Sequence, residues 1–281
     1  MKILFVIFLF SLAIFAKESF TISNAFYGED IDKVNYKDAK TAMDMWIKEL
    51  AKNMDAKSEL TFYTDFDKVK QARAKGKVDM LLLSPISYLK NLHYCKTHFD
   101  QGWLKKEDDG KPFFRLIILK RKNSKVKKVY RVHYYEYSTT AKMVAEIYGW
   151  ENYLQMTFQK TLKESKPVLD LFFKKCDYAV VQEHTWNLMQ ELNPQLTQKL
   201  EIVHKSKRIF VDLISLFSNR LSQKDKDAYF RVIGAINTTA AGKQLMRLFK
   251  FNGLIRIDNE QFSPLENYYQ EYIQLREKHV H

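Results

Sequence analysis

Residues 76–88 have the sequence GKVDMLLLSPISY, and this stretch decides the expected fold. Gly76 ends a short helical pattern over residues 67–75, and residues 78–83 form an apolar run of strand length. The run ends at Ser84-Pro85, which turns the chain and leaves hydroxyl groups directly after the strand. A buried strand that follows a helix and delivers a polar loop is typical of an α/β protein.

The segments before this stretch alternate between strand and helix. Residues 19–26 alternate in polarity like a strand, residues 38–53 have helical spacing, and residues 59–63 are rich in β-forming types. Together with the helix and strand that follow, this order predicts a parallel α/β sheet. Residues 113–119 add a further strand to this first block.

A second α/β block follows the basic run at residues 120–128. The expected elements are strands at 129–134, 177–181, 200–203 and 209–217, helices at 139–148 and 184–191, and a helical tail from 222 with segments at 225–236, 239–249 and from 264 onward. Two blocks and a tail that neither block needs indicate an α/β protein of two lobes, in which the chain crosses the hinge at 120–128 and at 204–208.

We therefore expect residues 17–122 and 208–281 to form the first lobe and residues 123–207 to form the second. Each lobe should hold a parallel or mixed sheet, in the manner of a type II periplasmic binding protein. Ligands of open α/β sheets bind beyond the carboxyl ends of the strands. Two such lobes are thus expected to hold a ligand cleft between them.

The N-terminus has the pattern of a Sec-type signal peptide. Lys2 precedes an apolar run over residues 3–15, and the small residue Ala16 follows it. An uncleaved membrane anchor is the alternative, but a membrane span needs about 20 apolar residues. We expect cleavage near Ala16 and a periplasmic protein.

Charge and cysteine content narrow the possible partners. Lys and Arg number 46 against 33 Asp and Glu, a net charge of +13 that favours acidic partners. The basic runs are scattered, which indicates solvated faces and no nucleic-acid site. Cys95 and Cys176 fall in different expected lobes, so we predict two free, buried thiols although an exported protein could form a disulfide.

The sequence shows no recognisable catalytic motif. It contains no Gly-rich phosphate loop, no nucleophile elbow, and no His, Cys and carboxylate cluster at metal-ligand spacing. We therefore expect a monomeric binding protein with no enzymatic activity, no cofactor and no metal.

Several motifs resemble those of PhnD-like periplasmic substrate-binding proteins, which serve ABC transporters for phosphate, phosphite and phosphonates. Residues 76–88 are similar to the family's first-lobe motif, and Tyr137-Ser138-Thr139-Thr140 resembles its Ser/Thr-rich loop. Residues 174–183 resemble its second-lobe strand, residues 206–212 its return segment, and residues 242–264 its ending. The resemblance covers almost the whole mature chain and implies a receptor for a small anionic or zwitterionic ligand that works with an ABC permease.

The candidate ligand contacts lie in both expected lobes: Tyr27, Ser84, Ser87, Tyr88, Ser138, Thr139, Thr140, Glu183 and Asp212. Ser138, Thr139 and Thr140 precede a helical pattern, and a helix N-terminus with hydroxyl groups is suited to an anion. The alternative is that Ser138 or Thr139 only caps the helix. Each first-lobe hydroxyl can likewise be structural.

Two acids bear on the charge of the ligand. Glu183 follows the strand at 177–181, and the resemblance places Asp212 where the family has an acid that can face an amino group. A carboxylate repels a phosphonate, so these acids favour a zwitterion or a protonated oxyanion, with surface acids as the alternative.

The chain also departs from the family. It has no counterpart, around residues 163–167, of a ligand-binding His, and Lys174 replaces a Gly. These departures leave the identity of the ligand open, and another oxyanion or a small zwitterion is the alternative to a phosphonate. A periplasmic sensor that signals to a histidine kinase or chemoreceptor is the alternative function.

Overall fold

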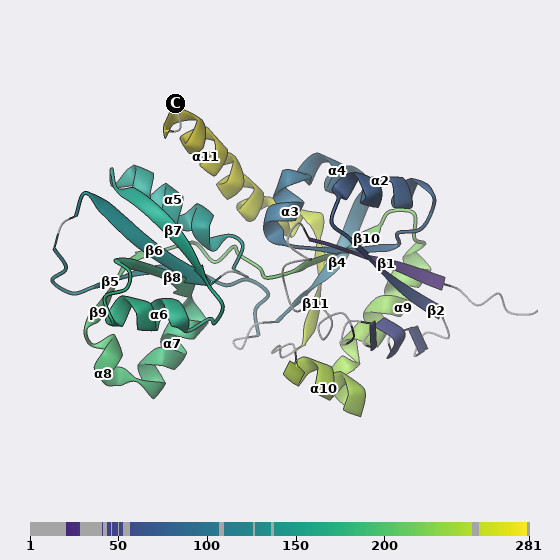
Figure 1. Cartoon of the computed structure of the whole chain (residues 1–281). Helices are drawn as coiled ribbons and strands as arrows, with labels where there is room; N and C mark the ends of the chain where they lie inside the picture. Colours follow the sequence, from purple (N-terminus) through teal and green to yellow (C-terminus); the bar gives the residue numbers. More distant parts are fainter. Residues whose placement is uncertain are drawn as a thin grey trace, which may run out of the picture.

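The apolar run of residues 78–83 forms β3 (Met80–Leu83), whose four side chains are fully buried. In the computed structural model (Figure 1), this strand lies in the half of the molecule drawn in purple, blue and yellow-green. The structure describes residues 21–28, 41, 44–45, 47–49, 51–52, 57–106, 110–125, 127–135, 138–248 and 253–279. The expected signal peptide at 1–16 and Tyr137 lie outside these ranges. No helix in the described ranges is both long and apolar enough to cross a membrane.

The first sheet has, among the described residues, six strands in the order β11-β4-β10-β3-β1-β2. Its other strands are β1 (Thr21–Tyr27), β2 (Lys57–Tyr63), β4 (Phe99–Lys105), β10 (Ile214–Ser218) and β11 (Leu254–Asp258). β1 pairs in parallel with β2 and β3, whereas β10 is antiparallel to β3 and β4. The parallel part confirms the α/β sheet predicted from the N-terminal third of the chain.

The second sheet has the order β7-β6-β8-β5-β9 within the described residues. Its strands are β5 (Leu116–Arg121), β6 (Val129–Tyr135), β7 (Gln155–Thr161), β8 (Tyr178–Gln182) and β9 (Leu200–Lys205). β6 pairs in parallel with β7 and β8, and β5 is antiparallel to β8 and β9. The molecule is thus an α/β protein with two mixed β-sheets.

Helices cover both sheets. The first half carries α2 (Phe66–Ala74), α3 (Pro85–Lys90), α4 (Leu92–His98), α9 (Gln223–Gly234), the 3₁₀ turn η2 (Ile236–Thr238) and α10 (Ala240–Leu248). The second half carries α5 (Ala141–Glu151), α6 (Lys166–Phe172), α7 (Glu183–Leu192) and α8 (Pro194–Thr197). The chain ends with the turn η3 (Asn259–Phe262) and the long helix α11 (Ser263–His279).

Local interactions of residues 65–79 determine the position of β3. Asp65 caps α2 by accepting a hydrogen bond from the Asp67 N–H, and Gly76 ends that region with a φ of 72°, a left-handed conformation that glycine adopts at little cost. Asp79 Oδ2 then accepts a hydrogen bond from the Ser23 N–H at 2.8 Å, which joins β3 to β1. These contacts fix where β3 begins, at Met80.

The position of β5 corrects the expected division of the chain. Residues 17–122 were assigned to the first lobe, but β5 pairs with β8 and β9 in the second sheet. Its first four side chains, Leu116 to Leu119, are fully buried, and this sheet gives the strand a partner on each side. The outward connection therefore lies between β4 and β5, and the return connection runs through residues 206–213, between β9 and β10.

The two connections pair with each other. The Phe114 N–H donates to the Phe210 carbonyl at 2.9 Å, and the Phe210 N–H donates back to the Phe114 carbonyl at 3.3 Å. The Leu116 N–H donates to Ser206 Oγ at 2.9 Å. This short antiparallel contact is the hinge that joins the two lobes.

The C-terminal helix α11 contacts both lobes. Phe262, just before it, packs on Tyr88 of α3, with 5.2 Å between the ring centroids. Farther along, Tyr272 stacks on Trp150 of α5 at 5.6 Å and donates a hydrogen bond to Glu146 at 2.9 Å. The tail was expected to complete the first lobe alone, but Figure 1 shows α11 reaching toward α5.

Candidate functional site

The parallel strands of each sheet deliver polar residues at their carboxyl ends. In the first sheet β1 ends at Tyr27 and β3 is followed by Ser84. In the second sheet β6 leads to the segment that contains Ser138, and β8 leads to Glu183. These edges are where open α/β sheets bind their ligands.

Ser138, Thr139 and Thr140 form a turn that opens α5. The Ser138 N–H donates to the Tyr135 carbonyl at 3.0 Å, and the Ser138 carbonyl accepts from the Ala141 N–H at 2.9 Å. Thr140 occupies the N-cap position but makes no side-chain capping hydrogen bond. The first N–H groups of α5 are therefore not capped by this side chain.

Ser138 has an unusual environment within this turn. The residue is only 4% exposed, and its Oγ has no hydrogen-bond partner among the described residues. Buried hydroxyl groups are nearly always paired, so an unpaired one requires an explanation. Because Ser138 Oγ makes no capping hydrogen bond, capping does not explain its position.

Two of the first-lobe hydroxyl groups, those of Ser84 and Ser87, are paired with each other. Ser84 Oγ accepts from the Ser87 N–H at 3.1 Å and donates to Ser87 Oγ at 2.9 Å, so Ser84 caps α3. Tyr27 is buried against Phe66, with 5.1 Å between the ring centroids. Ser84 and Tyr27 end neighbouring strands at one edge of the first sheet.

Tyr88 is directed into the first lobe. Its side chain is fully buried, and its hydroxyl donates to Glu266 Oε1 of α11 at 2.7 Å. Lys96 donates to the other oxygen of Glu266 at 2.8 Å. Burial, together with the Glu266 carboxylate, raises the pKa of Tyr88. In this conformation the Tyr88 hydroxyl joins α3 to α11.

The two acids expected at the site contact other protein groups. Glu183 begins α7 and forms ion pairs with Arg208, Lys205 and Arg115. Asp212, in the return connection, accepts a hydrogen bond from Gln182 Nε2 at 2.8 Å. The structure thus brings Glu183 to the edge that holds Ser138, and it joins Asp212 to the end of β8.

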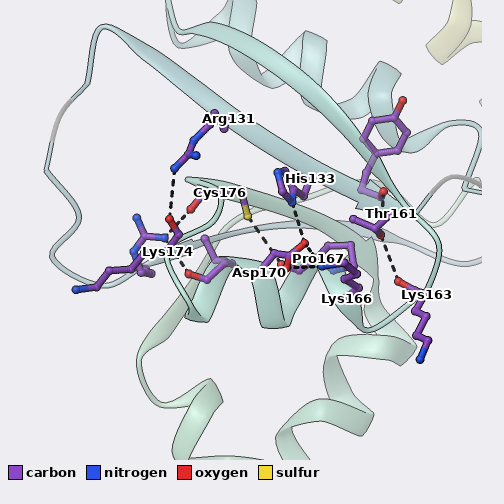
Figure 2. A network of polar contacts seen from close by, with 12 residues as sticks. Arg131, His133, Thr161, Lys163, Lys166, Pro167, Asp170, Lys174 and Cys176 are labelled. Atoms are coloured by element: carbon purple, nitrogen blue, oxygen red, sulfur yellow. Dashed lines mark hydrogen bonds and ion pairs between the residues drawn. The ribbon is translucent and has the colours of Figure 1, made fainter.

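A buried charge network, which the sequence did not reveal, supports this edge from within the second lobe (Figure 2). Asp170 of α6 accepts from Lys166 Nζ at 2.6 and 2.8 Å, and its Oδ2 lies 3.0 Å from His133 Nδ1 on β6. Burial alone would raise the pKa of Asp170, but the hydrogen bonds from Lys166 and His133 outweigh it and lower that pKa. The spacing of Lys166 and Asp170, four residues apart, was the only available sequence signal.

A separate pair of hydrogen bonds joins the ends of β6 and β7. Thr161 Oγ1 lies 3.2 Å from the Tyr134 carbonyl and 3.3 Å from the Lys163 carbonyl, so it joins the loop after β7 to β6 (Figure 2). Tyr134 lies four residues before Ser138. The end of β6, which precedes the Ser138 turn in the sequence, is therefore held in place from within the lobe.

The two cysteines are free and buried, as predicted. Cys95 lies in α4 beside the first sheet, and Cys176 precedes β8 of the second. Burial raises the pKa of each thiol to about 12. Their separation between the lobes leaves them without a disulfide.

Two mixed α/β sheets, joined by paired connections and with polar loops at the ends of their parallel strands, define a two-lobed solute-binding protein. A family model described as the periplasmic substrate-binding protein of phosphonate ABC transporters matches residues 33–262. The chain belongs to this family, which confirms the resemblance found in its sequence motifs. The family is periplasmic, and its members are the binding components of transporters.

Solved structures share the fold at low sequence identity. A binding protein component of an ABC phosphonate transporter from Pseudomonas aeruginosa is 14% identical, with a TM-score of 0.59 over 92% of this chain and 88% of that one. PhnD1 from Prochlorococcus marinus, in complex with methylphosphonate, is also 14% identical, with a TM-score of 0.59 and coverages of 89% and 97%.

A Xanthomonas citri protein bound to chloride ion is 10% identical, with a TM-score of 0.63 over 92% of this chain and 99% of that one. No curated protein matches the sequence. The solved structures therefore support the two-lobed fold.

Proposed function

We propose that the protein captures a small oxyanion or a phosphonate-like ligand between its lobes and delivers it to an ABC permease. The observation that carries this proposal is the buried Ser138 Oγ, which has no partner among the described residues and lies at the start of α5. A hydroxyl and the free N–H groups of a first helical turn are the donors that a phosphonate or phosphate oxygen accepts.

Two further observations support an anionic ligand. The chain has a net charge of +13, which attracts anions over distances comparable to the Debye length. The Prochlorococcus marinus relative is in complex with methylphosphonate. In this proposal Ser138, Thr139 and Thr140 hold the anion from the second lobe, and Tyr27, Ser84 and Ser87 close over it from the first.

The family description favours transport over the sensory alternative, since it names the binding component of a transporter. We further propose that the protein is exported, with cleavage near Ala16, and that it acts as a monomer that binds its ligand without chemical change. In this proposal the Tyr88 hydroxyl, which donates to Glu266, affects ligand binding indirectly, because it fixes the position of α11.

A ligand panel tests the proposal directly. Full-length protein is exported, purified from the periplasm and dialysed, and its melting temperature is measured with millimolar methylphosphonate, phosphite, phosphate, arsenate or methanesulfonate. A ligand at 100 times its Kd stabilises the folded state by about 2.7 kcal/mol, so a binder should raise the melting temperature by several degrees. An unchanged melting temperature with every compound would contradict the proposed function.

A further inference from the structure

Glu183, at the first position of α7, is surrounded by three cations. Its Oε2 lies 3.3 Å from Arg208 Nη2, and its Oε1 lies 3.4 Å from Lys205 Nζ and 3.8 Å from Arg115 Nη1. The Glu183 side chain is only 17% exposed, so solvent screens these pairs less than it screens pairs on an open surface. All three cations lie at or next to the two connections between the lobes.

Asp212 also has a partner within the protein. Its Oδ1 accepts a hydrogen bond from Gln182 Nε2 at 2.8 Å, and Gln182 is itself buried at the end of β8. In this structure both acids expected to face a ligand's amino group thus already contact other groups of the protein. An ammonium group that approached Glu183 would be repelled by the three cations that surround it.

The strand order places this charge cluster beside the candidate anion site. β8 lies between β6 and β5, so the loop after β6, the start of α7 and the residue before β5 are neighbours at one edge. At that edge Arg115, Lys205 and Arg208 outnumber the carboxylates of Glu183 and Asp212 by one, and the N-terminus of α5 adds partial positive charge. The local field therefore attracts anions and repels an ammonium group.

We propose that the site selects ligands that carry negative charge alone and disfavours zwitterions that carry an ammonium group. This inference rests on the proposed function, because it concerns the ligand of the same site. It differs from the sequence-based expectation, in which Glu183 and Asp212 favour a zwitterion. Arg208, Lys205 and Arg115 set the preferred ligand charge, and Glu183 holds their side chains at the edge.

Two phosphonates that differ by one amino group provide the test. Isothermal titration calorimetry of the full-length exported protein at low ionic strength measures the Kd of ethylphosphonate and of 2-aminoethylphosphonate. We expect ethylphosphonate to bind about tenfold more tightly. Because Glu183→Gln removes a negative charge near the anion, this variant should bind ethylphosphonate about threefold more tightly than the unmodified protein.

A matched control and a second variant complete the experiment. Glu201 pairs with Lys120 at 3.4 Å near the other end of β5, so Glu201→Gln should leave both Kd values unchanged. Arg208→Gln should weaken ethylphosphonate binding by about threefold to tenfold, and it replaces Glu183→Gln if that variant does not fold.

The outcomes separate the two proposals. If 2-aminoethylphosphonate binds as tightly as ethylphosphonate or more tightly, the inference about ligand charge fails and the proposed function stands. Weaker aminophosphonate binding in Glu183→Gln would assign that carboxylate to the amino group and also overturn the inference. Binding of neither compound would remove the proposed phosphonate function and this inference together.

Discussion

At the scale of single residues, Ser138 presents an energetic question. A buried hydroxyl group without a partner costs about 1–3 kcal/mol relative to a paired one. This cost applies to the Ser138 side chain at the start of α5, where Thr140 also makes no side-chain capping hydrogen bond. Such a cost is readily explained where a bound anion accepts the hydrogen bond.

Replacement of Ser138 separates binding from folding. Ser138→Ala removes one charge-assisted hydrogen bond, so methylphosphonate affinity should fall about tenfold or more, while the free energy of unfolding without ligand stays constant or rises slightly. Calorimetry and urea unfolding measure the two effects. The control is Ser215→Ala in β10, since Ser215 is also buried with an unpaired Oγ. Equal affinity in both variants would place the anion elsewhere.

Asp177 provides a residue-scale test of pH dependence. Burial disfavours its charged form, but the hydrogen bonds from the Arg131 N–H at 2.9 Å and from Lys127 Nζ at 2.6 Å outweigh burial and lower the pKa of Asp177. A lowered pKa contributes stability above the unfolded value near about 4, and this stability is lost as the pH falls through the folded value.

We therefore expect Asp177→Asn to lower the free energy of unfolding by about 2 kcal/mol at pH 7, with a smaller difference at each lower pH below about 4. Urea unfolding of both proteins between pH 7 and pH 2.5 measures the difference. A destabilisation that does not change with pH would show that the charge of Asp177 is not its cause.

At the scale of elements, the strands and helices with strong patterns were predictable from sequence. The apolar run of β3 and the helical spacing of α9 and α10 match their observed positions within a few residues. β7 was missed because most of its side chains are partly or fully exposed, which leaves little apolar pattern. β5 was found but assigned to the wrong sheet, since a buried strand has the same pattern in either one.

Side-chain partners were the least predictable part of the candidate site. The Tyr88 hydroxyl binds Glu266, 178 residues away, and no local pattern identifies such a pair. The ion pairs of Glu183 depend on Arg115 and Arg208, which the two connections bring together only in the folded chain. The Ser138 turn was predictable because a run of hydroxyl residues directly precedes a helical pattern.

The contact between α5 and α11 can be tested at this scale. Trp150 stacks on Tyr272 with an interplanar angle of 21° and on His279 with an angle of 5°. Trp150→Ala should lower the free energy of unfolding by about 2 kcal/mol because both stacks are lost. Tyr153 lies just beyond α5 and is 92% exposed, so Tyr153→Ala is the control and should change little. Equal effects would mean that α11 contributes no stability through Trp150.

At the scale of the whole molecule, two lobes meet at the paired connections around Phe114 and Phe210. In each sheet, the first strand after a connection pairs antiparallel with one of the parallel strands. In the second sheet β5 pairs with β8, and in the first sheet β10 pairs with β3. This arrangement carries the chain across the hinge twice. The polar residues that follow β1, β3, β6 and β8 are the groups that a bound solute would contact.

The separation of the cysteines between lobes gives a prediction for the intact protein. Cys95 and Cys176 should react with a thiol reagent only after unfolding, because burial raises their pKa values to about 12 and leaves little thiolate. A thiol count should give near zero under native conditions and two under denaturing, non-reducing conditions. Zero free thiols after unfolding would indicate a disulfide and contradict the placement of the two residues.

The central claim is that an anion binds at the start of α5, and a crystal structure of the protein grown with methylphosphonate tests it most directly. The account predicts a phosphonate oxygen within hydrogen-bond distance of Ser138 Oγ and of N–H groups in the first turn of α5 beyond that of Ala141, which donates to the Ser138 carbonyl. A phosphonate bound elsewhere on the molecule, with Ser138 still unpaired, would contradict it.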